Sequence, residues 1–253
     1  MGDKVCVVSG SSSGIGAATV KRYAREGWNV VVNGASNRAA ADAVADDCRG
    51  LGVQAQVVMA DVSQDADCRR LAAEVDSAFG RCDVLVNNAG ATRFVGLRNL
   101  DGLQAEDFHA IYAVNVVGPY QLTRALVPLL RRHPGAGVVN VSSIASMMGT
   151  GSSIAYMASK GALNAMTVGL ARALGPEIRV NAVAPGFVET PWLAKGLGAQ
   201  YEARREGYRQ RALLDAVLSP DDVADAAWWL GAGAAKTTGE VLLLDAGLRL
   251  TKA

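Results

Sequence analysis

A strand, a glycine-rich turn and the start of a helix follow one another in Val5-Cys-Val-Val-Ser-Gly10-Ser-Ser-Ser-Gly14-Ile-Gly16. Glycines at these three positions allow a tight turn, let a phosphate group approach the backbone and let the helix lie close on the strand. A helix that begins at about residue 14 would present free N–H groups and a partial positive charge to that phosphate. We therefore expect a phosphate-binding turn at the edge of a sheet, although a plain strand–helix turn has the same local pattern.

From this turn onward, short Val-rich runs alternate with longer Ala-rich amphipathic segments. We expect strands at about 5–10, 29–33, 53–61, 83–90, 137–143, 177–186 and 239–247. We expect helices at about 14–26, 36–50, 64–79, 104–116, 119–131, 154–174 and 220–230. The strict alternation predicts a doubly wound, seven-stranded parallel α/β sheet with helices on both faces, and the absence of a linker predicts one domain over residues 1–253.

The regular alternation breaks at about 187–214. This segment follows Pro185-Gly186 and contains one further proline and several glycines together with two tyrosines and four arginines. Long insertions at the carboxyl edge of such a sheet commonly form lids or binding loops. We expect an irregular insertion that acts as a substrate lid; the alternative is a solvated helix pair whose arginines face water.

Composition argues against several classes of protein. The net charge is +1 and neither sign forms blocks, which speaks against nucleic acid or a membrane surface as the main partner. The four cysteines form no CxxC pair and the two histidines are far apart, so we expect reduced thiols and no metal site. The N-terminus has no leader pattern, and no apolar run approaches the ~18 residues of a membrane span, so we expect a cytoplasmic protein.

A tyrosine and a lysine lie one helical turn apart in Tyr156-Met-Ala-Ser-Lys160. Free tyrosine titrates near pH ~10, and a cation within ~4–6 Å can lower that pKa by about one to three units. The phenol would then exchange a proton near neutral pH. Most such pairs on helices are surface accidents, so this interpretation depends on the residues upstream.

The end of the second strand bears on the choice of nicotinamide dinucleotide. A site for NAD usually places an acid there to hold the ribose 2′-hydroxyl, whereas a site for NADP lacks the acid and supplies a cation. The segment Asn33-Gly-Ala-Ser36-Asn-Arg38 has no acid before Asp42, and Ser36 and Arg38 could hold a 2′-phosphate. The glycine turn itself carries no Lys or Arg. We expect NADP(H) to be favoured over NAD(H).

With these motifs in order, the chain resembles the short-chain dehydrogenase/reductase family from the first strand to the C-terminus. Besides the glycine turn, the matching motifs are Asp61-Val62, Asn87-Asn88-Ala89-Gly90, Asn115 in NVVG, Ser143 in VNVSS, Tyr156 with Lys160, and Pro185-Gly186 with Thr190. The resemblance implies a Rossmann-type fold. It implies dinucleotide contacts from Gly10, Ser12, Ser13, Gly14, Ile15, Gly16, Ser36, Arg38, Asp61, Val62, Asn88, Ala89, Gly90, Tyr156, Lys160, Pro185, Gly186, Val188 and Thr190.

By the same resemblance, Tyr156 is the general acid in carbonyl reduction and the base in alcohol oxidation. Lys160 would lower the pKa of the phenol and bind the nicotinamide ribose, and Ser143 would donate to the substrate oxygen. Ser142 is a rival for that role, and Ser143 is preferred for its spacing from Tyr156. Asn115 would hold a water that links Lys160 to solvent. Strand-end and helix-end hydrogen bonding are the structural alternatives for the serines and for Asn115.

The sequence leaves the substrate open. The leading hypothesis is NADP(H)-dependent interconversion of a ketone and a secondary alcohol, with a 3-oxoacyl thioester as one substrate class. The alternatives are an NAD-dependent sugar or alcohol dehydrogenase and a non-catalytic dinucleotide-binding sensor. An apolar pocket would draw on Phe94, Leu97, Phe187, Trp192, Leu193, Leu197 and Tyr201. The resemblance also implies a homodimer or homotetramer, with a small-residue ridge at Gly161, Ala165, Gly169 and Ala173 facing either a partner or the sheet.

Overall fold

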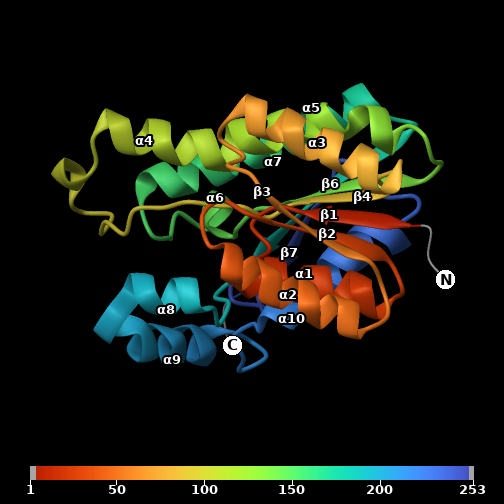
Figure 1. Cartoon of the computed structure of the whole chain (residues 1–253). Helices are drawn as coiled ribbons and strands as arrows, with labels where there is room; N and C mark the ends of the chain where they lie inside the picture. The colour runs from red at the N-terminus through yellow and green to blue at the C-terminus, as the bar shows by residue number, and fades with distance from the viewer. Residues whose placement is uncertain (1–3, 251–253) are drawn as a thin grey trace.

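A parallel β-sheet forms the centre of the computed structural model, which describes residues 4–250 (Figure 1). Its strands are β1 (Val5–Val8), β2 (Asn29–Gly34), β3 (Ala55–Met59), β4 (Val84–Asn87), β5 (Ala136–Val141), β6 (Ile178–Pro185) and β7 (Val241–Leu244). They lie in the order β3-β2-β1-β4-β5-β6-β7, and every neighbouring pair is parallel. The sheet therefore grows outward from β1 in both directions, which confirms the predicted doubly wound fold.

Helices cover both faces of this sheet (Figure 1). One face carries α3 (Asp65–Phe79), α4 (Ala105–Tyr112), α5 (Gly118–Leu130) and α7 (Ile154–Leu174). The other face carries α1 (Gly14–Arg25), α2 (Arg38–Gly50) and α10 (Pro220–Trp228). The remaining helices are α6 (Ala145–Met148), α8 (Pro191–Leu197) and α9 (Tyr201–Arg211). Within residues 4–250, no helix combines the length and the apolar character needed to cross a membrane.

Residues 105–130 form one continuous helical run, so the expectation of two separate helices was wrong. A π-helical turn, Ala113–Val117, joins α4 to α5, and the residues at both junctions keep helical dihedral angles. Pro119 has no N–H to donate to the preceding turn, so a regular α-helix would leave a carbonyl unpaired. The wider π turn adapts the helix at this point and holds Asn115 in the protein interior.

The 187–214 segment is more regular than expected, because its central part folds into α8 and α9. Pro191 occupies the first turn of α8, where a missing N–H is tolerated, and Thr190 caps that helix by accepting from the Leu193 N–H at 3.2 Å. Gly198 ends α8 with a φ of +51°. The expected irregular insertion is therefore a helix pair.

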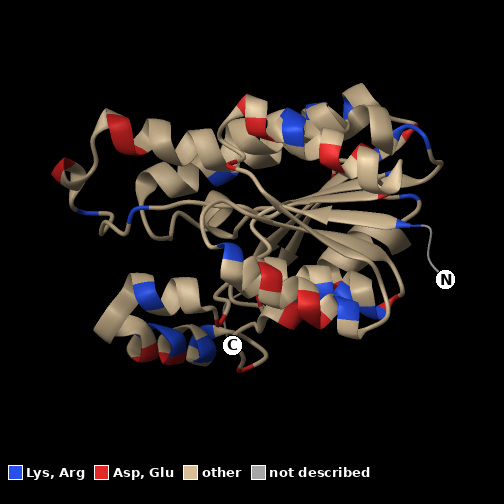
Figure 2. Ribbon diagram, in the orientation of Figure 1, with Lys and Arg blue, Asp and Glu red and all other residues tan. Residues whose placement is uncertain are grey.

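Lys and Arg alternate with Asp and Glu along the helices (Figure 2). Many pair within one helical turn, such as Arg69 with Asp65 at 2.8 Å and Arg49 with Asp46 at 2.6 Å. Each exposed pair of this kind contributes only about 0–1 kcal/mol to stability. The similar numbers of positive and negative residues along the helices agree with the net charge of +1.

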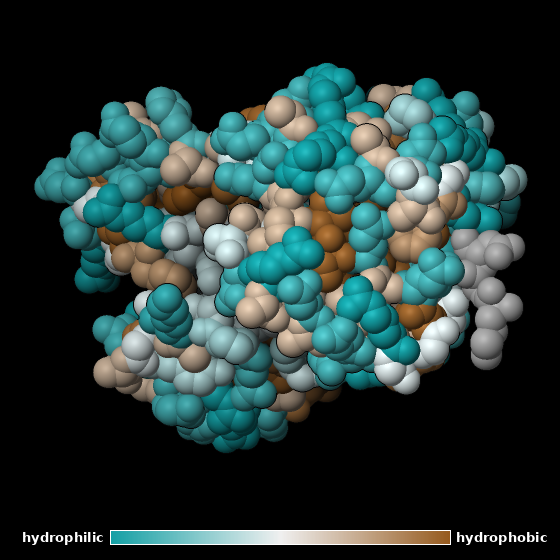
Figure 3. Space-filling model, viewed as in Figure 1, coloured by the Kyte–Doolittle hydropathy of each residue, from teal (hydrophilic) through white to brown (hydrophobic). Residues whose placement is uncertain are grey.

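A cleft of about 1110 Å³ opens at the carboxyl edge of the sheet. In Figure 3 the surface is hollowed between an upper lobe that contains α4 and a lower lobe formed by α8 and α9. Residues that follow β1, β4, β5 and β6 line this cleft together with residues of α8 and α9. Because parallel strands end at the same edge, side chains far apart in the sequence meet here.

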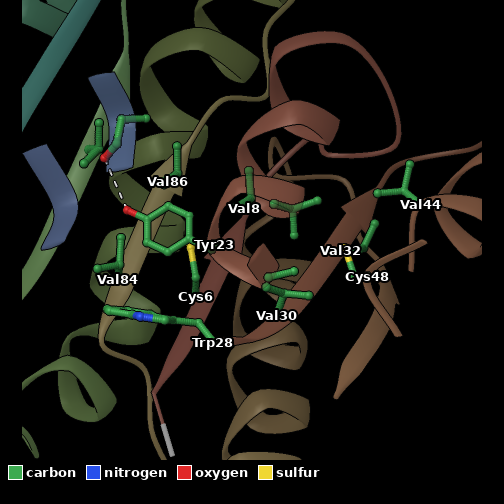
Figure 4. Close-up of a cluster of buried hydrophobic side chains, with 14 of the residues drawn as sticks. Cys6, Val8, Tyr23, Trp28, Val30, Val32, Val44, Cys48, Val84 and Val86 are labelled. Atoms are coloured by element: carbon green, nitrogen blue, oxygen red, sulfur yellow. Dashed lines mark hydrogen bonds between the residues drawn. The ribbon is translucent and has the colours of Figure 1, made fainter. Parts of the chain in front are cut away.

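Aromatic rings anchor α1 and α10 to the sheet. Tyr23, Trp28 and Trp228 meet edge to face, with ring centroids 4.8–5.4 Å apart. The Tyr23 hydroxyl donates to the carbonyl of Ala227 at 3.2 Å, and Figure 4 shows the ring lying among apolar side chains of the strands. Burying such rings typically contributes several kcal/mol, since deleting one costs about 3–5 kcal/mol. This packing fixes the axis of α1, whose first turn opens onto the cleft.

Candidate active site

The glycine-rich turn forms one end of the cleft. Gly10 and Gly14 have φ values of +61° and +53°, in the left-handed region that favours glycine. A Cβ at Gly10 would lie 2.8 Å from the Cα of Ala89, so the turn packs directly on the segment after β4. Ser13 occupies the N-cap of α1 without a side-chain hydrogen bond, which leaves the first N–H groups of the helix uncapped. This geometry suits an anion.

A buried asparagine, which the sequence analysis did not single out, holds this turn in place. Asn33 Oδ1 accepts from the Gly10 N–H at 3.0 Å. Its Nδ2 donates to the carbonyls of Val58 and Ala60, each at 3.0 Å. One side chain at the end of β2 thus connects the glycine turn to β3.

Gly16 lies behind the turn and does not line the cleft. The side chain of Asn88 donates to the carbonyls of Ser9 and Gly10, each at 2.9 Å, and a Cβ at Gly16 would overlap the Asn88 amide. The missing side chain at Gly16 therefore makes room for the clamp between the turn and the segment after β4. In the structure this glycine has a packing role.

The end of the cleft beside β2 and β3 is lined by Ser36, Asp61 and Val62, three of the predicted cofactor contacts. Arg38 does not line the cleft. Its guanidinium pairs with Asp42 at 3.4 Å on the exposed first turn of α2. In this arrangement the one cation predicted for a 2′-phosphate is engaged by a carboxylate.

Ser143, Tyr156 and Lys160 meet in the cleft beyond the end of β5. Ser153 caps α7 by accepting from the Tyr156 N–H at 3.2 Å, which places Tyr156 in the first turn and Lys160 in the second. The Ser143 hydroxyl lies beside the Tyr156 phenol and acts on its pKa. Lys160 Nζ donates to the carbonyl of Val141 at 2.8 Å and lies 5.7 Å from the centre of the Tyr156 ring.

Burial governs the acidity of this group of residues. It raises the pKa of Tyr156 to about 12, although the hydrogen bond with Ser143 acts in the opposite direction. Burial also lowers the pKa of Lys160 to about 8. The expectation that Lys160 brings down the pKa of the phenol is therefore wrong for the protein alone, because loss of hydration dominates and the ammonium is directed to the Val141 carbonyl.

A chain of hydrogen bonds fixes the two serines after β5. The Ser142 hydroxyl donates to Asn164 Oδ1 at 2.6 Å, and Asn164 Nδ2 donates to Ser146 Oγ at 2.9 Å. The Ser146 hydroxyl then donates to the carbonyl of Ser143 at 2.6 Å. Ser142 is thus engaged away from the phenol, and Ser143 faces it. In the sequence, only the position of Asn164 on the predicted helix of Tyr156 points to this role.

Asn115 lies behind the cleft and is fully buried. Its Oδ1 accepts from the Ala91 N–H at 2.7 Å, and its Nδ2 donates to the Ala91 carbonyl and to Ser159 Oγ, each at 2.9 Å. Both amide hydrogens are therefore engaged within the protein. A Cβ at Gly90 would lie 3.6 Å from Asn115 Oδ1 and 3.9 Å from Lys160 Nζ, so the asparagine supports the wall next to the lysine.

The segments after β4 and β6 complete the cleft. It is lined by Asn88, Ala89, Gly90, Pro185, Gly186, Val188 and Thr190, as well as by Gly10, Ser12, Ser13, Gly14 and Ile15 of the turn. The Thr190 methyl group would lie 3.5 Å from a Cβ at Gly14, so the segment after β6 faces the glycine turn. An uncapped helix N-terminus, a turn without bulky side chains and a buried ammonium further along fit a nicotinamide dinucleotide.

Beyond Tyr156 the lining becomes aromatic and aliphatic. Of the predicted pocket residues, the cleft is lined by Phe94, Phe187, Trp192, Leu193 and Leu197, but not by Leu97 or Tyr201. The rings of Phe94 and Trp192 are 5.7 Å apart, and a Cβ at Gly196 would overlap Phe94. The cleft is also lined by four residues that were not predicted to form the substrate pocket: Gly196, Gln200, Arg204 and Tyr208.

Comparison with known proteins agrees with this geometry. A family model described as enoyl-(acyl carrier protein) reductase matches residues 10–249. The chain is 44% identical, over 97% of its length and 96% of the relative, to ketoacyl reductase 2 assigned to the granaticin polyketide synthase of Streptomyces violaceoruber. It is 35% identical to a 3-oxoacyl-[acyl-carrier-protein] reductase of Thermotoga maritima, over 97% of each chain. A crystal structure of a short-chain dehydrogenase/reductase from Burkholderia xenovorans matches with a TM-score of 0.91 and 44% identity, over 98% of each chain. The chain belongs to the short-chain dehydrogenase/reductase family of NAD(P)-dependent oxidoreductases.

Proposed function

We propose that this protein reduces a ketone to a secondary alcohol with NADPH, and that Tyr156 is the general acid. The observation that carries the proposal is the meeting of Tyr156, Ser143 and Lys160 in the same cleft as the uncapped glycine turn. A bound nicotinamide supplies the hydride. Since the pKa of Tyr156 is raised to about 12, its phenol holds a proton at neutral pH and can donate it to the substrate oxygen.

The neighbouring side chains support that proton transfer. The Ser143 hydroxyl would donate to the substrate oxygen and stabilise its developing negative charge. Lys160, still mostly charged at neutral pH with a pKa of about 8, would stabilise the phenolate that the transfer leaves behind. Asn115 would position the 90–91 segment beside Lys160. A water bound by Asn115 would have to use a lone pair of Oδ1 or a backbone group, because both of its amide hydrogens are engaged.

A preference for NADPH is supported by the end of β2. Asn33, Ala35 and Ser36 line the cleft there and none of them is acidic, so no carboxylate at the end of β2 would repel a 2′-phosphate. Arg38 would have to exchange Asp42 for the phosphate, which is feasible because the pair is exposed. We expect Arg38→Ala to raise the KM for NADPH about 10-fold while leaving the KM for NADH nearly unchanged, and equal effects on both would contradict this assignment.

The substrate class that we propose is a 3-oxoacyl thioester. The names of the relatives from Streptomyces violaceoruber and Thermotoga maritima refer to ketoacyl and 3-oxoacyl reductases, and the aromatic and aliphatic lining beyond Tyr156 suits an acyl chain.

The free, buried cysteines favour a reducing, cytoplasmic location. A homodimer or homotetramer is supported by the ridge on α7, where a Cβ at Gly161 or Gly169 would meet no described atom within 4 Å.

The test is a panel of 3-oxo thioesters, sugars and simple ketones, each incubated with NADPH and with NADH while cofactor absorbance is followed. We expect turnover of the thioesters with NADPH, and a loss of roughly 100- to 10,000-fold in kcat for Tyr156→Phe. Tyr112→Phe, which alters a tyrosine of α4 outside the cleft lining, is the matched control and should be silent. Turnover confined to sugars with NADH would favour a sugar dehydrogenase, and cofactor binding without any turnover would favour a sensor.

A further inference from the structure

One face of α9 presents polar side chains to the cleft. Three residues spaced four apart, and therefore on one helical face, line it: Gln200 at the N-cap, Arg204 and Tyr208. The cleft-lining residues of α8 are instead apolar: Trp192, Leu193, Gly196 and Leu197. The helix pair thus gives the cleft an apolar wall followed by a polar wall.

Arg204 is the arginine of α9 that the rest of the protein leaves unpaired. Within residues 4–250 its side chain makes no hydrogen bond, ion pair or ring contact. Its neighbours differ, because Arg205 pairs with Glu189, Arg209 pairs with Glu206 at 2.8 Å, and Arg211 donates to the Gly207 carbonyl at 3.0 Å. The carboxylates near α9 are therefore already committed to other arginines.

Arg204 differs in its surroundings from the other charged residues that line the cleft. Three ionisable acids and bases other than tyrosine line it: Asp61, Lys160 and Arg204. Asp61 follows β3, at the glycine-turn end, and Lys160 is bound to the Val141 carbonyl. Among the described lining residues, the α8–α9 side of the cleft therefore has a cation but no carboxylate to neutralise it. Guanidinium groups bind carboxylate and phosphate oxygens through paired, charge-assisted hydrogen bonds.

The position of α9 relative to the catalytic group is also fixed. The ring of Tyr208 packs on Phe187 at a centroid distance of 5.1 Å, and Phe187 directly follows Gly186 of the cleft wall. The ion pair of Arg205 with Glu189 ties the helix to the same segment. The polar face of α9 is therefore held at a defined reach from Tyr156, as a subsite requires.

We propose that Gln200, Arg204 and Tyr208 form a subsite for an anionic group, a carboxylate or a phosphate ester, that the ketone substrate carries at a distance from its reacting carbonyl. The apolar residues of α8 and Phe94 contact the chain between the two ends. This assignment rests on the proposed ketone reduction, since it defines the remote end of that substrate. The subsite makes the enzyme selective for charged ketones over neutral ketones of the same length.

The experiment compares three 3-oxo thioesters with the same acyl part, whose thiol part ends in a neutral amide, a carboxylate or a phosphate monoester. We expect Arg204→Gln to lower kcat/KM roughly 10- to 100-fold for a charged substrate and less than about 2-fold for the neutral one. The phosphate and carboxylate arms show which anion the subsite prefers. Lys195→Gln, which removes an exposed cation of α8 outside the cleft lining, is the matched control and should affect none of the three.

Two results would overturn the subsite. An equal loss on all three substrates would make Arg204 a structural residue of the helix pair. A rise in the KM for NADPH with every substrate would assign Arg204 to a phosphate of the cofactor.

Turnover of the neutral thioester by the wild-type enzyme tests the proposed function separately. Calorimetry with the phosphate-bearing alcohol product, added to the NADP⁺-saturated enzyme, tests the subsite even without turnover: we expect about 10-fold weaker binding to Arg204→Gln, and unchanged binding would refute it.

Discussion

At the scale of single residues, acidity in the cleft depends on hydration as much as on neighbouring charge. Tyr156 and Lys160 are one turn apart, yet the ammonium donates to a backbone carbonyl and burial moves both pKa values toward the neutral forms. A proton donor with a pKa of about 12 suits reduction, provided that a cation is present to stabilise the phenolate it becomes. The charge state of Lys160 should therefore control the rate.

The pH dependence of ketone reduction follows from the lowered pKa of Lys160. The lysine is charged below about pH 8 and neutral above it, so we expect kcat/KM for reduction to fall as the pH rises through about 8. In Lys160→Arg the cation persists to much higher pH, because a guanidinium has a pKa above ~12. Whatever activity remains in that variant should lack the fall near 8. A wild-type profile that stays flat from pH 7 to pH 10 would contradict the argument.

Asn164 acts on catalysis through Ser143, according to the hydrogen-bond chain that connects them. Asn164→Leu removes the bridge from Ser142 to Ser146 and frees the backbone of Ser143. We expect kcat to fall about 10-fold with little change in the KM for NADPH, since an unpaired polar group and a displaced donor each cost about 1–3 kcal/mol. Arg172→Gln, at an exposed position of the same helix outside the small-residue ridge, is the control. A proportional loss of folded protein, seen by circular dichroism, would mean that the effect is structural.

The site could be predicted from the sequence where its geometry is local. A four-residue spacing on α7 and a glycine turn between β1 and α1 are set by backbone rules, and both lie in the cleft as predicted. Gly16, Arg38 and Asn115 do not line it, because the pattern does not tell a cleft contact from a packing contact behind it. The sequence did not indicate the roles of Asn33, Asn164 and Arg204. Their hydrogen-bond partners, or the other residues that line the cleft, come from distant parts of the chain.

At the scale of helices and strands, hydrophobic periodicity predicted the regular elements correctly. Prolines and glycines, which commonly break helices, led to a wrong prediction of irregular chain. The prediction of a helix at 154–174 matches α7, whereas Pro191 and Gly198 suggested irregular chain in a region that forms α8 and α9. Each breaker stands at a helix end, where it is tolerated. The π turn was missed because its cause, Pro119, looks in sequence like an ordinary helix start.

The turn after β7 contains a correctable strain. Ala246 has a φ of +53°, a left-handed conformation that costs an alanine about 1–2 kcal/mol. Ala246→Gly removes that cost but gives the unfolded chain more freedom, so we expect a net gain of about 0.5–1 kcal/mol and a Tm higher by about 2 °C. Gly247→Ala is the reverse test, because its φ is +78° and its Cβ would lie 2.9 Å from Leu213. A lower Tm for Ala246→Gly would refute the assignment of strain.

At the scale of the whole molecule, the sheet order brings every functional segment to one edge and leaves the helical faces free. The ridge at Gly161 and Gly169 faces away from the sheet, and Val117, Tyr120 and Val168 are exposed on the same layer of helices. Exposed apolar groups gathered on one layer of helices commonly mark contact between protein copies. The proposed homodimer or homotetramer would use this layer.

Replacing Val168 by glutamate should weaken such an assembly. We expect Val168→Glu to elute later than wild type in size-exclusion chromatography with light scattering, because each interface would bury unpaired charge. Leu51→Glu, an exposed position at the end of α2 on the opposite layer, should leave the assembly unchanged. A wild-type protein of monomer mass at micromolar concentration would rule out the proposed oligomer.

Gly196 has no side chain, so the size of the residue at this position affects the width of the cleft between the two lobes. Phe94 fills the room that the glycine leaves, and Trp192 lies beside it. Any bulkier residue at 196 must swing the Phe94 ring aside and so reshape the passage without touching the proton donor. Laboratory evolution toward branched or bicyclic ketones would therefore begin most productively at this single codon.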